Sequence, residues 1–310
     1  MQKLKILIYV FFAIYVSANK SISLENEIVF KINNEIITKV DVENEYKYLI
    51  LLNKNLKNLN REEIIEISKR SIIKERIKKI ELLKNFENPV IPKKYLELIL
   101  QNIYKQIDIE NLDDFKKYLI SNNVIYNDVV KKIEIEALWN ELIIEKFSSK
   151  LKIDKQKIRD RIISKKNEIT KSYLLSEIVF EISNSKELSS KYEKIIKTIK
   201  EKSFNSAALT YSTSDTSNTG GNLGWIDENS LNKKLREILS SMKENEFTEP
   251  ITIPGGFMIL NIRKIKEIEL IKNIDEEVNK VINLQKNIQL NQFSKMYFNK
   301  IKKGIQINEI

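Results

Sequence analysis

Glycine is rare in this chain and concentrated in one segment. Five of its six glycines and two of its four prolines lie between Tyr173 and Lys264, whereas the remainder is built mainly of Ile, Lys, Asn, Glu and Leu. Glycine and proline permit sharp turns and close backbone approaches, so this concentration marks a compact, turn-rich unit. The segment is therefore expected to fold as a module of its own.

Hydrophobic periodicity gives the order of elements within this segment. A β-branched and aromatic run predicts an opening strand, and apolar residues at helical spacing predict helices before and after a glycine-rich loop. Pro254, Gly255 and Gly256 supply the turn of a closing hairpin. The predicted strand is 173–182, the helices are 186–202, 204–211 and 231–242, the loop is 220–225, and the hairpin strands are 249–253 and 257–262.

This order of elements resembles the parvulin family of peptidyl-prolyl cis/trans isomerases. The match includes Leu-Ser-Glu-Ile-Val at 175–179 and Gly-Gly-Asn-Leu-Gly-Trp at 220–225, where the family typically reads Gly-Gly-Asp-Leu-Gly-Trp. Glu-Pro-Ile at 249–251 and Gly-Phe-Met-Ile at 256–259 follow in the family's order. The resemblance covers the whole glycine-containing segment and implies a prolyl-binding site.

The chain departs from the family at that site. Parvulins typically place one histidine in the first strand and another in the last, around an acidic or thiol residue beside the prolyl amide. This chain has no histidine; Glu177 and Met258 stand at the two positions, and Asn222 replaces the aspartate of the loop. Asp215, or a neighbouring serine, is the candidate for the central polar residue. Whether the chain is an enzyme is therefore left open.

Prolyl isomerisation requires neither a nucleophile nor a cofactor. Its barrier of about 18–20 kcal/mol is the loss of amide resonance, which an apolar pocket and well-placed polar groups can lower. The resemblance implies that Leu231, Leu235, Phe257 and Met258 form the peptide-binding pocket, so weak peptide binding is expected and fast catalysis is not. The alternative is that all four are core residues, as apolar residues at regular spacing usually are.

The first 18 residues predict a cleaved export signal. Lys3 and Lys5 precede an apolar run from Ile6 to Val16, and small residues precede a cut after Ala18. An apolar core of this length is too short for a membrane helix, which needs about 20 residues. No stable membrane insertion is expected, with an uncleaved anchor as the alternative.

Composition excludes several partners and cofactors. Without the two lysines of the signal the net charge falls from +10 to +8, but lysine and glutamate are interspersed and no basic run is interleaved with aromatic residues. A solvated surface is thus favoured over a nucleic-acid partner. Neither cysteine nor histidine is present, so disulfides are excluded and a zinc site is not expected. No phosphate-binding glycine loop occurs, and we expect no metal and no cofactor.

A hairpin and several helices precede the module. Two β-branched runs around Asn33 and Asn34 predict the hairpin, and Thr38 followed by Asp41 marks the start of a helix. Apolar stripes predict more helices at 61–83, 93–106, 112–122 and 126–150, a linking helix up to the module, a helix at 274–302 and a last strand at 304–310.

The hairpin followed by helices resembles the amino-terminal domain of SurA-type periplasmic chaperones, on the residues Ile28 to Thr38 and Asp41. The resemblance implies that the last strand pairs with the opening strands, and that the parvulin module is a satellite of the domain so closed. Many SurA proteins carry two parvulin modules, whereas this chain has room for one.

These features predict an α+β protein, with a mostly helical amino-terminal domain, a parvulin-like module, and a final helix and strand that return to the first domain. The predicted units are 1–18 signal peptide, 19–150 helical domain, 151–172 linking helix, 173–266 parvulin-like domain, and 267–310 carboxy-terminal helix and strand.

The resemblance implies a periplasmic, ATP-independent chaperone that holds unfolded outer-membrane protein clients, with prolyl isomerase activity weak or lost. An active prolyl isomerase that catalyses folding is the alternative. A non-enzymatic surface-binding protein is a third hypothesis, supported only by the +8 charge. A signal peptide indicates export alone, so the periplasmic location also rests on the resemblance. Neither client identity nor oligomeric state follows from the sequence.

Overall fold

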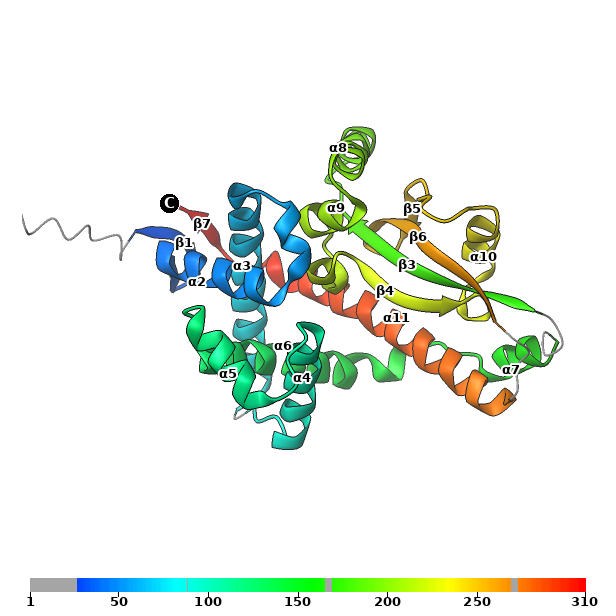
Figure 1. The fold of residues 1–310 in the computed structure, drawn as a ribbon, viewed down its shortest axis with the longest axis horizontal. Coiled ribbons are helices and arrows are strands. Elements are labelled where there is room, and N and C mark those ends of the chain that lie inside the picture. The colour runs from blue at the N-terminus through cyan, green and yellow to red at the C-terminus, as the bar shows by residue number, and fades with distance from the viewer. Residues whose placement is uncertain (1–26, 88, 165–168, 269–272) are drawn as a thin grey trace, which may run out of the picture.

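The structure, a computed structural model, describes residues 27–87, 89–164, 169–268 and 273–310. The predicted signal peptide lies outside these residues. Two lobes can be distinguished: the helical lobe, residues 27–150 with the last strand, and the sheet lobe, residues 169–268 (Figure 1). The long helix α11 (Ile274–Lys302) runs alongside both.

Both ends of the described chain meet in a three-stranded antiparallel sheet of the helical lobe. Strands β1 (Ile28–Ile32) and β2 (Glu35–Thr38) form the predicted hairpin, with Asn33 at a φ of 50° in its turn. Strand β7 (Ile307–Glu309) pairs with β1 on the side away from β2. The prediction that the last strand returns to the opening hairpin is confirmed.

The helices of this lobe follow the predicted order because each buries one apolar stripe. The elements are α2 (Lys39–Leu52), α3 (Arg61–Asn85), α4 (Lys93–Gln106), α5 (Leu112–Ser121) and α6 (Tyr126–Phe147), with 3-10 turns at Lys54–Asn58 (η1) and Ser148–Lys150 (η2). The interior of the lobe includes a cluster around Phe115, one around Trp139, and one between the hairpin and α3.

Helix α2 begins with the capping box that the sequence predicted. Thr38 Oγ1 accepts a hydrogen bond from the Asp41 amide at 3.2 Å, and Asp41 Oδ2 accepts one from the Thr38 amide at 2.8 Å. We expect Thr38→Ala to lower the free energy of unfolding by about 1 kcal/mol, because the Asp41 amide loses its acceptor in the first turn. Urea titration measures this loss.

The control for the cap is Asn102→Ala, at an exposed position inside α4. Alanine favours a helix interior over asparagine by a few tenths of a kcal/mol, roughly 0.5 on common scales. This control should therefore keep or raise stability, and an equal loss in both variants would contradict the role of the cap.

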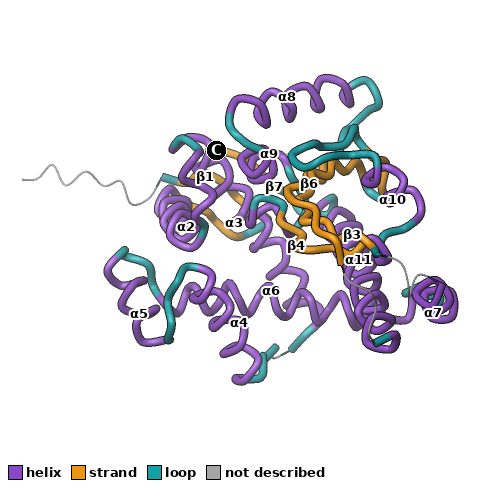
Figure 2. The backbone as a smooth tube through the Cα atoms, turned by 45° about the vertical axis from the view of Figure 1, so that its right-hand side comes forward, coloured by secondary structure: helices purple, strands orange, loops and turns teal. Residues whose placement is uncertain are grey.

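The sheet lobe is a four-stranded antiparallel sheet in the order β4-β3-β6-β5. Helices α8 and α9 pack on one face and α10 on the other, and the strands lie among these helices and α11 (Figure 2). The elements are β3 (Thr170–Phe180), α8 (Glu187–Glu201), α9 (Phe204–Tyr211), β4 (Asn222–Asp227), α10 (Lys233–Ser240), β5 (Ile251–Ile253) and β6 (Gly256–Ile268), with 3-10 turns at Asp215–Thr219 (η3) and Glu228–Ser230 (η4).

Two local expectations differ from the structure. The segment predicted as a glycine-rich loop contains strand β4, because its residues pair with β3 from Ser172 to Ser176. The linking helix predicted over 151–172 is shorter: α7 spans Lys155–Ser164, and Thr170 already pairs with Ile268 in the sheet. None of the helices in the described ranges is long and apolar enough to cross a membrane.

The sheet lobe packs directly on the helical lobe, whereas the resemblance to SurA-type chaperones implied a satellite module. Leu209 of α9 is buried in a cluster with residues of α2, η1 and α3. Arg70 of α3 donates to the carbonyl oxygens of Thr210, at 2.5 Å, and Leu209, at 3.3 Å. Lys202, just before α9, lies 2.5 Å from Glu63. Apolar burial and charged hydrogen bonds thus join the lobes at α9.

Candidate functional site

Strand pairing brings the residues at the two parvulin histidine positions onto one face of the sheet. On β3, Ile178 and Phe180 pack toward α8 and α9. Side chains alternate along a strand, so Glu177 faces the other side, toward α10. Glu177 pairs with Leu260 of β6, and Val179 with Met258, two residues away. Glu177 and Met258 therefore lie on neighbouring strands of one face.

An apolar cluster occupies this face. Leu231, Leu235 and Met258 belong to it, so the structure brings three of the four predicted peptide-binding residues together. Leu223 of β4 packs in the same cluster and was not predicted, because its segment was interpreted as a loop.

Phe257 lies apart from these three residues. It packs on the opposite face, with its ring 5.8 Å from that of Phe180. Since successive residues of a strand point to opposite faces, Phe257 and Met258 cannot both face one site. This alternation is the signal in the sequence that would have separated them.

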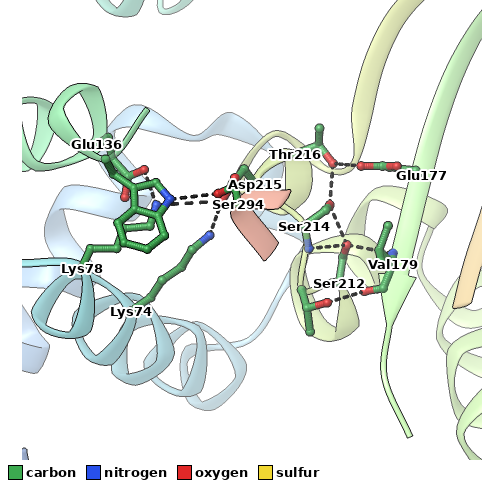
Figure 3. Close-up of polar contacts among 12 residues, drawn as sticks. Lys74, Lys78, Glu136, Glu177, Val179, Ser212, Ser214, Asp215, Thr216 and Ser294 are labelled. Carbon is green, nitrogen blue, oxygen red and sulfur yellow. Dashed lines mark hydrogen bonds and ion pairs between the residues drawn. The ribbon is translucent and has the colours of Figure 1, made fainter. Parts of the chain in front are cut away.

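A row of three hydroxyl groups, which we call the hydroxyl chain, connects Glu177 to the loop after α9 (Figure 3). Thr216 Oγ1 donates to Glu177 Oε1 at 2.8 Å and lies 2.7 Å from Ser214 Oγ. Ser214 Oγ is 3.0 Å from Ser212 Oγ, which accepts from the Val179 amide at 3.0 Å. The loop is thereby fixed along β3.

Burial raises the pKa of Glu177, while hydrogen bonds from Thr216 and Ser214 and the charge of Lys295 act in the opposite direction. The negative charge of Asp215 adds to the increase. An ionised carboxylate only accepts hydrogen bonds, whereas a neutral imidazole both donates and accepts. Glu177 in its ionised form cannot reproduce the role that a histidine could have there.

Asp215 points away from the sheet and toward the helical lobe (Figure 3). Lys74 of α3 donates to Asp215 Oδ1, and the ammonium of Lys78 lies 4.0 Å from the same oxygen. Burial alone would raise the pKa of Asp215, but attraction to the two lysines and the hydrogen bond from Lys74 lower it to about 2. Of the alternatives left open by the sequence, the structure places Ser214, and not Asp215, beside Thr216 and Glu177.

Asn222 is engaged in the start of β4. Its Oδ1 accepts from the Gly224 amide at 2.9 Å and from Arg263 Nη2 at 2.5 Å. The preceding Gly221 accepts from the Glu177 amide at 2.8 Å. These contacts join the glycine-rich segment to β3 and β6. In the part of the chain that the structure describes, no group of three or more acidic residues is placed to hold a metal ion.

Comparison with known proteins assigns the sheet lobe to a family. The family model described as rotamase, PPIC-type PPIASE domain, matches residues 174–264. The chaperone SurA of Pseudomonas putida is 24% identical over 163 residues, which cover 50% of this chain and 38% of that protein. Residues 174–264 are thus a parvulin-type domain, in a chain that is similar to SurA chaperones. The α+β fold class and the resemblance predicted from the sequence are thus confirmed.

Two solved structures complete the comparison. A crystal structure of a PpiC-type peptidyl-prolyl cis-trans isomerase domain is 30% identical and covers 34% of this chain and 97% of its own, with a TM-score of 0.28. A structure of one of two SurA-like chaperones of Campylobacter jejuni is 18% identical. The match covers 92% of this chain and 99% of that one, with a TM-score of 0.36. This chain spans 38% of the length of the Pseudomonas putida SurA that it matches.

Proposed function

We propose that this chain is a periplasmic, ATP-independent chaperone that holds unfolded outer-membrane protein segments and has weak or no prolyl isomerase activity. One observation supports the second part of this proposal, the weak or absent prolyl isomerase activity. The parvulin site keeps its apolar cluster, with Leu231, Leu235 and Met258 on one face, whereas its polar part is Glu177 with the hydroxyl chain. Such a site can bind an apolar peptide without the groups that would twist its prolyl amide.

Exposed apolar side chains on the helical lobe support a holding role. They lie at the end of α3, before and along α4, at the end of α5 and just before α6, and Val90 is the most accessible at 80%. Where such side chains gather into one patch, exposed apolar surface typically marks an interaction site. The other members of the group are Leu83, Tyr95, Leu98, Ile120 and Ile125. A protein that binds unfolded chains lowers their free concentration by mass action, which requires no nucleotide.

The periplasmic location is supported by the export signal predicted over the first 18 residues and by the relationship to SurA chaperones. The choice of outer-membrane protein clients is also a proposal from that relationship. A direct test mixes residues 19–310 with a urea-unfolded outer-membrane barrel protein and follows light scattering after dilution of the urea. Suppressed scattering at equimolar chain, retained at high salt, supports the proposal. Suppression that salt abolishes would favour a charge-driven surface binder instead.

The isomerase part has its own test in the exchange of a short aromatic-proline peptide, measured by NMR. We expect residues 19–310 at catalytic concentration to leave the exchange rate at its uncatalysed value, while the resonances of Leu223, Leu231 and Leu235 shift on peptide addition. The double variant Glu177→His, Met258→His should raise the rate, because it restores imidazoles on neighbouring strands of the face that binds the peptide.

The control for this variant is Glu177→Gln, Met258→Leu, which changes the same positions without adding a titratable ring. Rapid exchange with the unmodified chain would establish the alternative, an active prolyl isomerase acting as a folding catalyst. Acceleration by the control variant would show that the imidazoles are not the missing groups.

A further inference from the structure

The loop that carries the hydroxyl chain has two chemically different sides. Ser214 and Thr216 face β3 and Glu177, whereas Asp215 between them faces α3 of the helical lobe (Figure 3). A rotation of this loop that turned Asp215 toward the sheet would place a second carboxylate near Glu177. The partners of Asp215 therefore bear on the composition of the parvulin site.

Those partners are held in place by the helical lobe itself. Lys74 and Lys78 are four residues apart and so share one face of α3. The side chain of Lys78 is only 1% exposed; its ammonium lies 2.5 Å from Glu136 of α6 and 5.5 Å from the ring of Trp139. Lys78 is thus part of the packed lobe, whereas the side chain of Lys74 is 30% exposed and is held by its ion pair with Asp215.

The backbone before the loop is fixed to the same helix. Arg70, one turn before Lys74, donates to the carbonyl oxygens of Leu209 and Thr210 at the end of α9. On the other side of Asp215, the side chain of Asn53 donates to the carbonyl oxygen of Asn218. The helical lobe contacts the segment before, at and after Asp215.

We propose that Lys74 and Lys78 are positioning residues of the parvulin site: by holding Asp215 on the helical lobe, they fix the loop so that hydroxyl groups, and no second carboxylate, lie beside Glu177. The inference rests on the site of the proposed function. It does not depend on whether that site isomerises a prolyl bond or only holds a peptide.

The charges around the two carboxyl groups predict in which direction the pKa of Glu177 should change when either partner is removed. Glu177 is influenced by the hydroxyl groups of Ser214 and Thr216, by Lys295 of α11 and by Asp215. Asp215 is influenced by Lys74 and Lys78, and Lys78 is shared with Glu136 of α6. Removing a lysine leaves the charge of Asp215 less compensated and should raise the pKa of Glu177, whereas removing the charge of Asp215 should lower it.

The test is an NMR titration of the Glu177 carboxyl in the whole exported chain, residues 19–310, labelled with 13C at the glutamate carboxyls. Loss of a signal in Glu177→Gln assigns the resonance. Lys74→Gln is expected to move the midpoint of Glu177 to higher pH, and Asp215→Asn to lower pH. The control Lys69→Gln lies on the same helix but pairs with Glu66, at 2.7 Å, and should leave the midpoint unchanged.

Opposite shifts from two changes at one ion pair distinguish positioning from a loss of packing, which would move both midpoints in one direction. Shifts of equal sign, or no shift in either variant, would overturn the inference. Should Lys74→Gln not fold, Asp215→Asn decides by itself, and an unchanged midpoint there overturns it. The titration contains no client, so its failure is independent of the holding and exchange experiments.

Discussion

Gly221→Ala is expected to lower the free energy of unfolding of the sheet lobe by about 3 kcal/mol, the sum of a strained backbone of about 1–2 kcal/mol and a lost buried hydrogen bond of about 1–3 kcal/mol. Gly221 has a φ of +78°, and an added Cβ would lie 2.1 Å from the carbonyl oxygen of Glu177. The backbones must separate, which breaks the 2.8 Å bond from the Glu177 amide to the Gly221 carbonyl. Urea unfolding followed by circular dichroism measures the loss.

Gly224→Ala is the matched control, since Gly224 has a φ of +74° and nothing lies within 4 Å of an added Cβ. It carries the conformational strain without the collision and should cost about 1–2 kcal/mol. Equal losses in the two variants would show that the close approach of β4 to β3 contributes nothing. In Gly221→Ala, the Glu177 resonance should also broaden or move, because the strand that carries this carboxyl is displaced.

Trp139→Ala is expected to destabilise the helical lobe by about 3–5 kcal/mol, the usual cost of deleting a large buried ring. Trp139 is 1% exposed, donates from Nε1 to Ser294 Oγ at 2.9 Å, and stacks on Tyr297 with ring centroids 5.8 Å apart. Lys78 lies 5.5 Å from the same ring. Removal of the Trp139 ring leaves a cavity where α3, α6 and α11 meet. Thermal and urea unfolding should both report a loss of this size.

The second of the two tryptophans supplies the comparison. Trp225 is 41% exposed and carries Lys266 at 4.3 Å from its ring centre, so Trp225→Ala should cost less than about 1 kcal/mol. Each variant keeps one tryptophan, whose fluorescence reports a different lobe. A loss at Trp225 as large as that at Trp139 would contradict the assignment of Trp139 to the core.

Local rules were sufficient for most of the fold. The capping box at Thr38, the helix over 93–106 and the long helix over 274–302 occur where spacing and capping residues predict them. These features depend on interactions within a few residues. Strand β4 was not predicted because its pairing with β3 is long-range, and three of the residues just before it or within it are glycines with positive φ.

The candidate site could be predicted only in part. The separation of Phe257 from Met258 follows from strand alternation, whereas the placement of Glu177 and Met258 on one face also needs the register between β3 and β6. The direction of Asp215 does not, because it depends on Lys74 and Lys78, which lie more than a hundred residues earlier in the chain. Nothing in the spacing of charges along one segment can indicate an ion pair between two lobes.

The length of helix α11 fixes the spacing between its contacts with the two lobes. Near its start, Lys280 pairs with Asp227 of the sheet lobe. Further along, Ser294 accepts a hydrogen bond from the indole of Trp139 in the helical lobe, and Asn299 donates to Glu181 of the sheet lobe at 2.6 Å. An added residue between these points would turn everything beyond it by about 100° and move it by about 1.5 Å. Substitutions along the exposed side of α11 should change stability little. A change in its length, in contrast, would misalign the contacts near its end relative to those near its start. The spacing of α11, more than its composition, is therefore what a functional variant of this chain must preserve.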